Sequence, residues 1–317
     1  MTSLSRFGLA VGHAADPNGG TGCTVVRGIS APHRAAVAVI GRATGSRELA
    51  LLEPGHLVER VDAIMLAGGS AYGLDAAAGV MRWMEARGRG FAVAGGVVPI
   101  VPAAVLFDLE PCGRFDARPT AAMGESACDR ATSENIDEGS VGAGTGLTVG
   151  KALGRGGAMK GGFGLAVCES NSCAAAAMVA VNAFGDVRDV SGRIIAGART
   201  PGGTFADTAR LLAAGSLDPA FGAAAPNTTL AVVAVDAAFS RVELQQIARA
   251  GTAAYHRRIT PAGSSVDGDI VFALSPMDGP RAPLVQAEML VVAALEEAIE
   301  RAVRLAIGRD GVPGIAD

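Results

Sequence analysis

Six short apolar runs, rich in valine, isoleucine and alanine, constrain the fold of this chain most strongly. They cover residues 35–40, 62–67, 164–168, 177–182, 230–235 and 269–274. Most of them do not alternate between apolar and polar residues, which is typical of strands that are buried on both faces. The sequence therefore predicts a set of short, buried β-strands spread along the whole chain.

Three helices are predicted between and after these runs. Apolar residues in helical register predict one helix over residues 74–87, which a glycine ends. Ser240 and Glu243 form a capping box that opens a second helix, reaching about His256. A proline begins a third helix over residues 283–306. Because strands and helices mix throughout, we expect an α/β or layered α+β architecture.

The overall composition favours one globular domain over residues 1–317. The 44 glycines are spread along the chain, so no linker or boundary stands out. A net charge of -4 without a basic cluster argues against nucleic acid or an anionic membrane as partner. No apolar stretch reaches 18 residues, and the N-terminus lacks the pattern of a signal peptide. We therefore expect a soluble, cytoplasmic protein.

The cysteines fit that compartment. Their number is odd and they form no C-x-x-C pair, so we interpret them as reduced thiols that fill the core. They are Cys23, Cys112, Cys128, Cys168 and Cys173.

The glycine-rich segment V-G-A-G-T-G-L-T-V-G-K, residues 141–151, invites a nucleotide-binding interpretation. A phosphate loop needs glycine where Thr145 stands and serine or threonine where Ala152 stands. The dinucleotide fingerprint fails as well, because its third glycine falls on Leu147 or Val149. What remains is a backbone that can approach another group closely and that ends in Lys151.

A second glycine-containing segment, L-A-G-G-S-A-Y-G-L-D, links a predicted strand to a predicted helix. Its glycines, such as Gly69, and Ser70 could present N–H groups to an anion or an oxyanion, or the segment is simply a tight turn. Tyr72 occupies the second glycine position of a G-x-S-x-G elbow, which argues against a Ser-His-Asp hydrolase. The histidines have no metal-ligand spacing, so we expect neither metal nor cofactor.

The junction Asn227-Thr228-Thr229 precedes one apolar run and carries polar side chains that a buried strand does not need. A threonine hydroxyl needs a base to take its proton, and an N-terminal threonine has one in its own α-amino group. That amine titrates near about 7.7 to 8.0. One hypothesis is that Thr228 attacks the Asn227 carbonyl, so that cleavage exposes Thr228 as a new N-terminus. The alternative is a turn with locally bonded side chains.

Other polar residues favour the cleavage hypothesis. Asp267 and Asp269 stand two residues apart where a strand begins, so an extended backbone directs both carboxylates to one side. There they could hold the new ammonium group, although a surface Asp-Gly turn is the alternative. Asn182 ends an apolar run and could donate to a developing oxyanion, or merely cap a strand.

Four ordered blocks resemble one known family. P-N-T-T-L-A-V-V-A, V-D-G-D-I-V-F-A-L, L-A-G-G-S-A-Y-G-L-D-A-A-A-G-V-M-R-W and G-A-G-T-G-L-T-V-G-K are similar to the self-processing N-terminal-nucleophile peptidases. That family includes L-aminopeptidase/D-esterases, β-peptidyl aminopeptidases and the nylon-oligomer endo-hydrolase. The resemblance spans nearly the whole chain, from G-H-A-A-D-P-N-G-G-T-G-C-T-V-V onward.

The resemblance implies a mechanism and a fold. It implies cleavage between Asn227 and Thr228 into chains of residues 1–227 and 228–317, with Thr228 as nucleophile. It places the family's active-site lysine on Lys151, with Lys160 as a second candidate, and its active-site asparagine on Asn182. The carboxylates of its D-G-D motif correspond to Asp267 and Asp269. The fold it implies is a four-layer α-β-β-α sandwich, usually assembled into homotetramers.

One position departs from the pattern and leaves the substrate open. Phe107 stands where the nylon-oligomer hydrolase has an active-site tyrosine, so the role of that hydroxyl is absent or filled from elsewhere. The resemblance implies hydrolysis of an α-peptide, β-peptide, D-amino acid amide or ω-amino acid oligomer, by endo or exo cleavage. Two alternatives are acyl transfer to an amine, as in ornithine acetyltransferases, and a small-molecule binding protein on the same scaffold.

Overall fold

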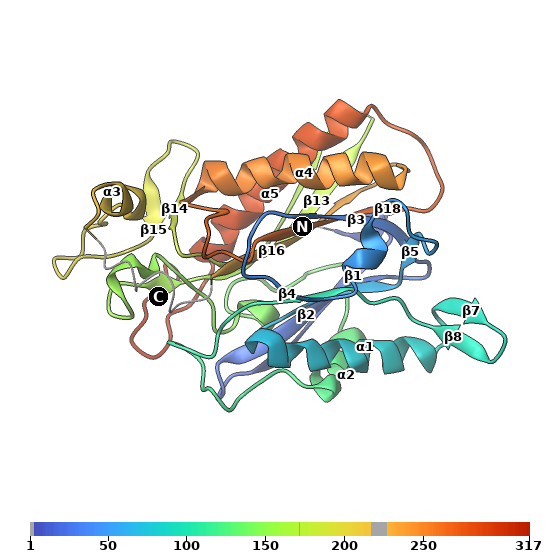
Figure 1. Ribbon diagram of the computed structural model, residues 1–317, viewed down its shortest axis with the longest axis horizontal. Helices are drawn as coiled ribbons and strands as arrows, with labels where there is room; N and C mark the ends of the chain where they lie inside the picture. The colour runs from blue at the N-terminus through green and yellow to red at the C-terminus, as the bar shows by residue number, and fades with distance from the viewer. Residues whose placement is uncertain (1–2, 171, 217–226) are drawn as a thin grey trace.

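Two mixed sheets form the centre of the molecule (Figure 1). The computed structural model describes residues 3–170, 172–216 and 227–317. The first sheet has the order β1-β2-β6-β9-β4, with the bounds Leu9–Asp16, Thr21–Gly28, Ala63–Ala67, Ala103–Val105 and Gly45–Arg47. The second sheet has the order β12-β13-β16-β18-β3-β5, with the bounds Gly162–Glu169, Ala174–Asn182, Thr228–Val235, Ile270–Pro276, His33–Val39 and Arg60–Val61.

Helices cover the outer faces of both sheets. The helices α1 (Ala76–Glu85) and α2 (Ala121–Asp129) pack on the first sheet. The helices α4 (Arg241–Arg258) and α5 (Leu284–Arg304) pack on the second. The smaller elements are α3 (Thr208–Ala213), β7 (Phe91–Val93), β8 (Gly96–Val98), β10 (Thr148–Val149), β11 (Met159–Lys160), β14 (Asp186–Arg188), β15 (Ile194–Ala196) and β17 (Ile259–Thr260).

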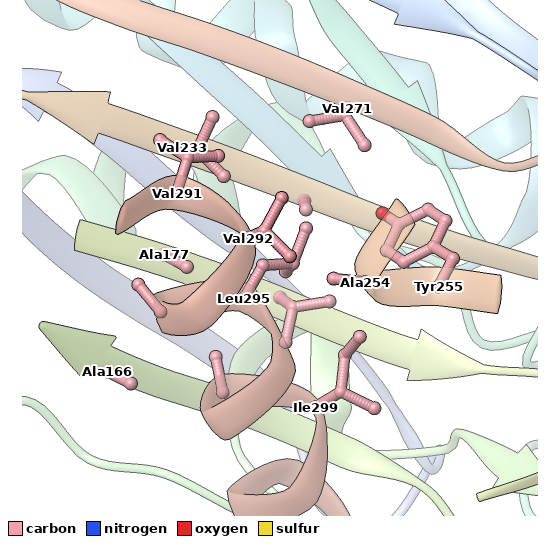
Figure 2. Close-up of a cluster of buried hydrophobic side chains, with 14 of the residues drawn as sticks. Ala166, Ala177, Val233, Ala254, Tyr255, Val271, Val291, Val292, Leu295 and Ile299 are labelled. Carbon is pink, nitrogen blue, oxygen red and sulfur yellow. The ribbon is translucent and has the colours of Figure 1, made fainter. Parts of the chain in front are cut away.

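The burial of β16 shows why its sequence does not alternate. Leu230 and Val232 point into the core between the two sheets. Ala231 and Val233 point into a separate core under α4 and α5, part of which Figure 2 shows. Since successive side chains of a strand point to opposite faces, both faces of this strand need apolar residues. By the same alternation, the side chain of Thr228, two residues before Leu230, lies on the face between the two sheets.

The layered α+β fold predicted from the sequence is confirmed. All six apolar runs lie within or largely overlap strands, and the capping box of Ser240 and Glu243 opens α4 as expected. The predicted helix over residues 74–87 differs at its start, because Ser70–Asp75 forms a 3-10 helix and α1 begins only at Ala76. The difference is only two residues long, and Asp75 already has right-handed helical dihedrals, with φ -59° and ψ -31°.

All five cysteines are free, and only Cys168 is partly exposed. Among the helices of the described ranges, none combines enough length with enough apolar character to span a bilayer.

Candidate active site

Thr228 is the first residue of β16 and is almost completely buried. Its hydroxyl donates to the carbonyl oxygen of Asn227, the residue before it, over 2.6 Å. The preceding residues Ala225 and Pro226, whose sequence indicates a proline-led turn, lie outside the described residues. The hydroxyl oxygen of Thr228 is therefore already held beside the peptide group that the cleavage hypothesis requires it to attack.

The segment that leads into the parallel neighbour β18 holds the other side of this peptide group. Thr228 lies level with Gly268 in the β16–β18 register, and Asn227 forms an isolated bridge with Asp267. The backbone N–H of Gly268 donates to the Asn227 carbonyl over 2.7 Å. A Cβ at Gly268 would lie 2.7 Å from the Thr228 hydroxyl oxygen and 2.6 Å from the carbonyl oxygen of Ala43. Only glycine therefore allows the backbone to approach the hydroxyl this closely.

Asn182 stands opposite Thr228 in the antiparallel β13–β16 pair. Directly opposed side chains of such a pair lie on the same face, so the Asn182 amide shares the inter-sheet face with the Thr228 hydroxyl. Its oxygen accepts from the N–H of Thr148 over 3.1 Å, and its nitrogen donates to the carbonyl of Phe107 over 3.0 Å. One of the two amide hydrogens of Asn182 is thereby used to fix the side chain, which leaves the second as a potential donor.

Lys151 connects the two asparagines. Its ammonium nitrogen lies 2.9 Å from the side-chain oxygens of both Asn182 and Asn227, and 3.2 Å from the Asn182 carbonyl. The lysine follows Gly150, whose φ is +65° and where a Cβ would lie 2.0 Å from the backbone of Gly197. The close backbone approach predicted for the glycine-rich segment therefore occurs, and it brings the lysine into the site.

The carboxylates of Asp267 and Asp269 accept hydrogen bonds from backbone N–H groups and from one hydroxyl group. Asp267 accepts from the N–H and the hydroxyl of Ser264, over 2.8 and 2.6 Å. Asp269 accepts from the N–H groups of Thr229 and Gly263, over 2.6 and 3.0 Å. Asp269 thus fixes the backbone of the residue that follows Thr228.

Burial dominates the electrostatics of the site. It lowers the pKa of Lys151 to about 7, because removal from water disfavours the charged amine more than the nearby carboxylates favour it. It raises the pKa of Asp269 to about 7, with the charge of Asp267 adding to the effect. It also raises the pKa of Asp267. Near neutral pH the site therefore contains groups that can both give and take a proton.

Lys160, the second lysine candidate, has other partners. It is buried and donates to the carbonyls of Thr145 and Leu147, each over 2.9 Å. Its pKa is lowered to about 8, mainly by burial. These contacts hold the segment that leads to Thr148, whereas Lys151 contacts the two site asparagines directly.

The predicted oxyanion donors Gly69 and Ser70 are committed to protein acceptors. The N–H of Gly69 donates to Asp108 over 2.6 Å, and that of Ser70 donates to the carbonyl of Leu106 over 2.9 Å. Tyr72 is exposed, and the guanidinium of Arg118 lies 3.5 Å from the centre of its ring.

Unlike Gly69, Ser70 and Tyr72, Phe107 contacts a site residue, because its carbonyl accepts from the side-chain nitrogen of Asn182. The next residue, Asp108, also accepts from the Thr21 hydroxyl over 2.7 Å, and burial raises its pKa to about 6.

The sequence did not identify Asp108 and Gly268 as site residues. A glycine between two acidic residues where a strand begins was the one available signal for Gly268.

Among the residues that the structure describes, no cluster of three or more histidine, cysteine, aspartate or glutamate side chains is arranged to hold an ion.

Known proteins with similar sequences span most of the chain. The sequence profile of the family described as Peptidase family S58 matches residues 7–311. An uncharacterized aminopeptidase of Mycobacterium tuberculosis is 40% identical over 294 residues, which cover 87% of this chain and 81% of that protein. A 6-aminohexanoate-oligomer endohydrolase of Kocuria sp. is 32% identical over 292 residues, which cover 84% of this chain and 73% of the relative.

Solved structures share the fold at lower identity. A β-aminopeptidase of Burkholderia sp. superposes with a TM-score of 0.70 at 19% identity, covering 99% of this chain and 90% of the other. An L-aminopeptidase D-Ala-esterase/amidase of Ochrobactrum anthropi gives a TM-score of 0.72 at 19% identity, covering 98% and 88%. The latter is described as a variant of the Ntn hydrolase fold, so the present chain has that kind of fold.

Proposed function

The chain belongs to peptidase family S58 and is a hydrolase of amide bonds, and we propose that it cuts itself before Thr228 and then uses Thr228 as its nucleophile. The family membership confirms the resemblance found in the sequence. The observation that carries the proposal is the 2.6 Å contact between the Thr228 hydroxyl and the carbonyl of Asn227, inside a buried polar site.

Self-cleavage begins with attack of the Thr228 hydroxyl oxygen on the Asn227 carbonyl carbon. As the C–O bond forms, negative charge develops on the carbonyl oxygen, to which the N–H of Gly268 already donates. The C–N bond then breaks, and a proton passes to the nitrogen of Thr228. Water hydrolyses the ester, which leaves a carboxylate on Asn227 and both an amine and a hydroxyl on Thr228. Lys151 contacts Asn227 and, with a pKa of about 7, supplies a neutral amine that can take the hydroxyl proton.

The cleaved enzyme repeats this chemistry on a substrate. The new amine of Thr228 takes the hydroxyl proton, the oxygen attacks the substrate carbonyl, and the amine returns the proton to the leaving amine. Asn182 and the N–H of Gly268 stabilise the oxyanion. We assign Asp267 and Asp269 the role of holding the ammonium form of Thr228, because Asp269 accepts from the N–H of the next residue, Thr229, and Asp267 bridges to Asn227. Water then releases the acyl group.

Mass analysis and N-terminal sequencing of the purified protein test the proposal. We expect two fragments, residues 1–227 and 228–317, with the second beginning T-T-L-A. Thr228→Ala should yield one uncut, inactive chain. An intact chain that hydrolyses amides as well as the wild type would overturn the scheme.

The names of the relatives indicate which substrates to try. A panel of α-aminoacyl, β-aminoacyl and 6-aminohexanoyl amides distinguishes aminopeptidase from oligomer hydrolase activity. Transfer of the acyl group to an added amine, rather than to water, would instead identify an acyltransferase. The homotetramer and the cytoplasmic location remain predictions, which light scattering and cell fractionation check.

A further inference from the structure

The peptide bond before Thr228 is the first substrate of the proposed site. During self-cleavage the acyl group of Asn227 becomes esterified to the Thr228 hydroxyl. During catalysis the acyl group of a substrate forms the same ester with the same oxygen. Because the two intermediates share one linkage on one atom, the space that receives Asn227 in the uncut chain is the space that receives the acyl residue of a substrate. The contacts of Asn227 therefore describe the acyl subsite.

Two contacts of Asn227 come from groups that remain when the chain is cut. The N–H of Gly268 donates to its carbonyl oxygen over 2.7 Å, which positions the reacting group. The amine of Lys151 donates to its side-chain oxygen over 2.9 Å, which positions the side chain. Lys151 also donates to Asn182, so its position depends on more than Asn227. The charged ammonium carries three N–H donors, one for each of its three acceptors, which are the side-chain oxygen of Asn227 and the two oxygens of Asn182.

The side chain of Asn227 lies in a buried environment. Both Asn227 and Lys151 are buried, and the amine has little access to water that could replace a lost acceptor. An acyl residue without an acceptor at this position would leave a buried donor unsatisfied, which costs more than the bond itself contributes. Such a site discriminates against apolar isosteres more strongly than an apolar pocket discriminates between sizes.

We propose that Lys151 defines an acyl subsite selective for residues with a carbonyl acceptor on the side chain, so that asparaginyl amides are preferred substrates. This inference rests on the proposed function and adds a substrate class to it. Leucine is the matched comparison, because its side chain has nearly the shape of asparagine and lacks the polar atoms. Selectivity between the two therefore reports the hydrogen bond rather than size.

Steady-state kinetics of the cleaved enzyme with asparaginyl and leucyl 4-nitroanilides test the subsite. Each is used with a free and with an acetylated amino group, because Asn227 is itself acylated in the chain. A hydrogen bond to a charged group contributes roughly 1.5–3 kcal/mol, so kcat/KM should favour asparaginyl by about 10-fold to 100-fold. Equal rates, or a preference for leucyl, would overturn the inference while leaving amide hydrolysis by Thr228 intact. Failure of the proposed function would instead appear as an uncut chain inactive on the whole amide panel.

The rate of self-cleavage provides a second measurement. Asn227→Leu keeps the shape of the junction but removes the acceptor, so self-cleavage should slow at least about tenfold. The thermal unfolding of Asn227→Leu in the Thr228→Ala background, compared with Thr228→Ala alone, shows whether the folded state is preserved. Cleavage of a folded Asn227→Leu chain at the wild-type rate would contradict the inference. A structure of the cleaved enzyme with Asn227 still bound to Lys151 would contradict it too, because the subsite would be filled.

Discussion

Asn182 and Thr228 face one another across the β13–β16 pair, with their side chains on the face between the two sheets. The amide of Asn182 is fixed by the carbonyl of Phe107, the N–H of Thr148 and the amine of Lys151. A donor that is held in place before the reaction stabilises charge without reorganising, which is the requirement for an oxyanion site. This relationship places the strand partner of the nucleophile among the catalytic groups of the proposed mechanism.

Replacement of this amide should affect chemistry more than folding. Asn182→Leu removes the oxyanion donor and should lower kcat by about 100-fold to 1000-fold in whatever cleaved enzyme forms. Val181→Ala, a change of the next residue on the opposite face, is the control and should lower stability alone. Activity of Asn182→Leu within a few-fold of the wild type would exclude Asn182 as an oxyanion donor.

Gly268 should tolerate no side chain. Gly268→Ala places a methyl group 2.7 Å from the Thr228 hydroxyl oxygen and 2.6 Å from the Ala43 carbonyl oxygen, so the segment that leads into β18 must shift away from the junction. We expect self-cleavage to slow by about 100-fold or more, as after loss of an oxyanion donor. Gly55→Ala is the control, because a Cβ there meets nothing within 4 Å. Densitometry of the two fragments over time measures both variants, and equal rates would remove Gly268 from the mechanism.

Self-cleavage should accelerate as the pH rises through about 7. The pKa of Lys151 is about 7, so its neutral, proton-accepting form increases above that pH and is lost below it. The measurement uses cell-free synthesis of the chain, followed by quenched time points between about pH 5.5 and 8.5, a window centred on that pKa. Lys151→Arg keeps a permanent positive charge and should abolish the rising limb. A rate that does not change, or falls, across this range would argue against Lys151 as the base.

Substitutions of the two buried lysines, Lys151 and Lys160, should have different effects. Lys160→Met removes the donor to the carbonyls of Thr145 and Leu147, and should lower the free energy of unfolding by about 1–3 kcal/mol while self-cleavage continues. Lys151→Met should instead block cleavage. Urea unfolding of each variant in the Thr228→Ala background gives the stability, and mass analysis gives the extent of cleavage. A block by Lys160→Met in a stably folded chain would reverse the assignment.

Much of the fold could be predicted because its strands are buried on both faces. The run at residues 230–235 becomes β16 for that reason. The strands β1 and β2 were not predicted, since glycine and polar residues such as Gly12, His13 and Thr24 interrupt their apolar pattern. The helix α2 was missed as well, because its small residues give only a weak amphipathic signal.

The site was predictable in its residue types but not in its contacts. The resemblance identified Thr228 and Asn182, which lie 46 positions apart in the sequence, and only the β13–β16 register shows that they are directly opposed. The sequence could not decide whether Lys151 or Lys160 is the lysine of the site. The backbone conformation decides it, because it directs the amine of Lys151 to the two site asparagines and that of Lys160 to the carbonyls of Thr145 and Leu147. The N–H of Gly268 carries no side-chain signal, so only the parallel alignment with β18 identifies it as a donor.

The order β13-β16-β18-β3 also determines how the two pieces of the proposed cleavage would stay together. The strands after the junction, β16 and β18, lie between two strands that precede it, so hydrogen bonds join the pieces along both edges of the inserted pair. Neither piece can dissociate without exposing strand edges and the cores on both faces of the sheet. The mature enzyme should therefore persist as an interleaved heterodimer, and heat inactivation should be irreversible because refolding then becomes a search between separate molecules.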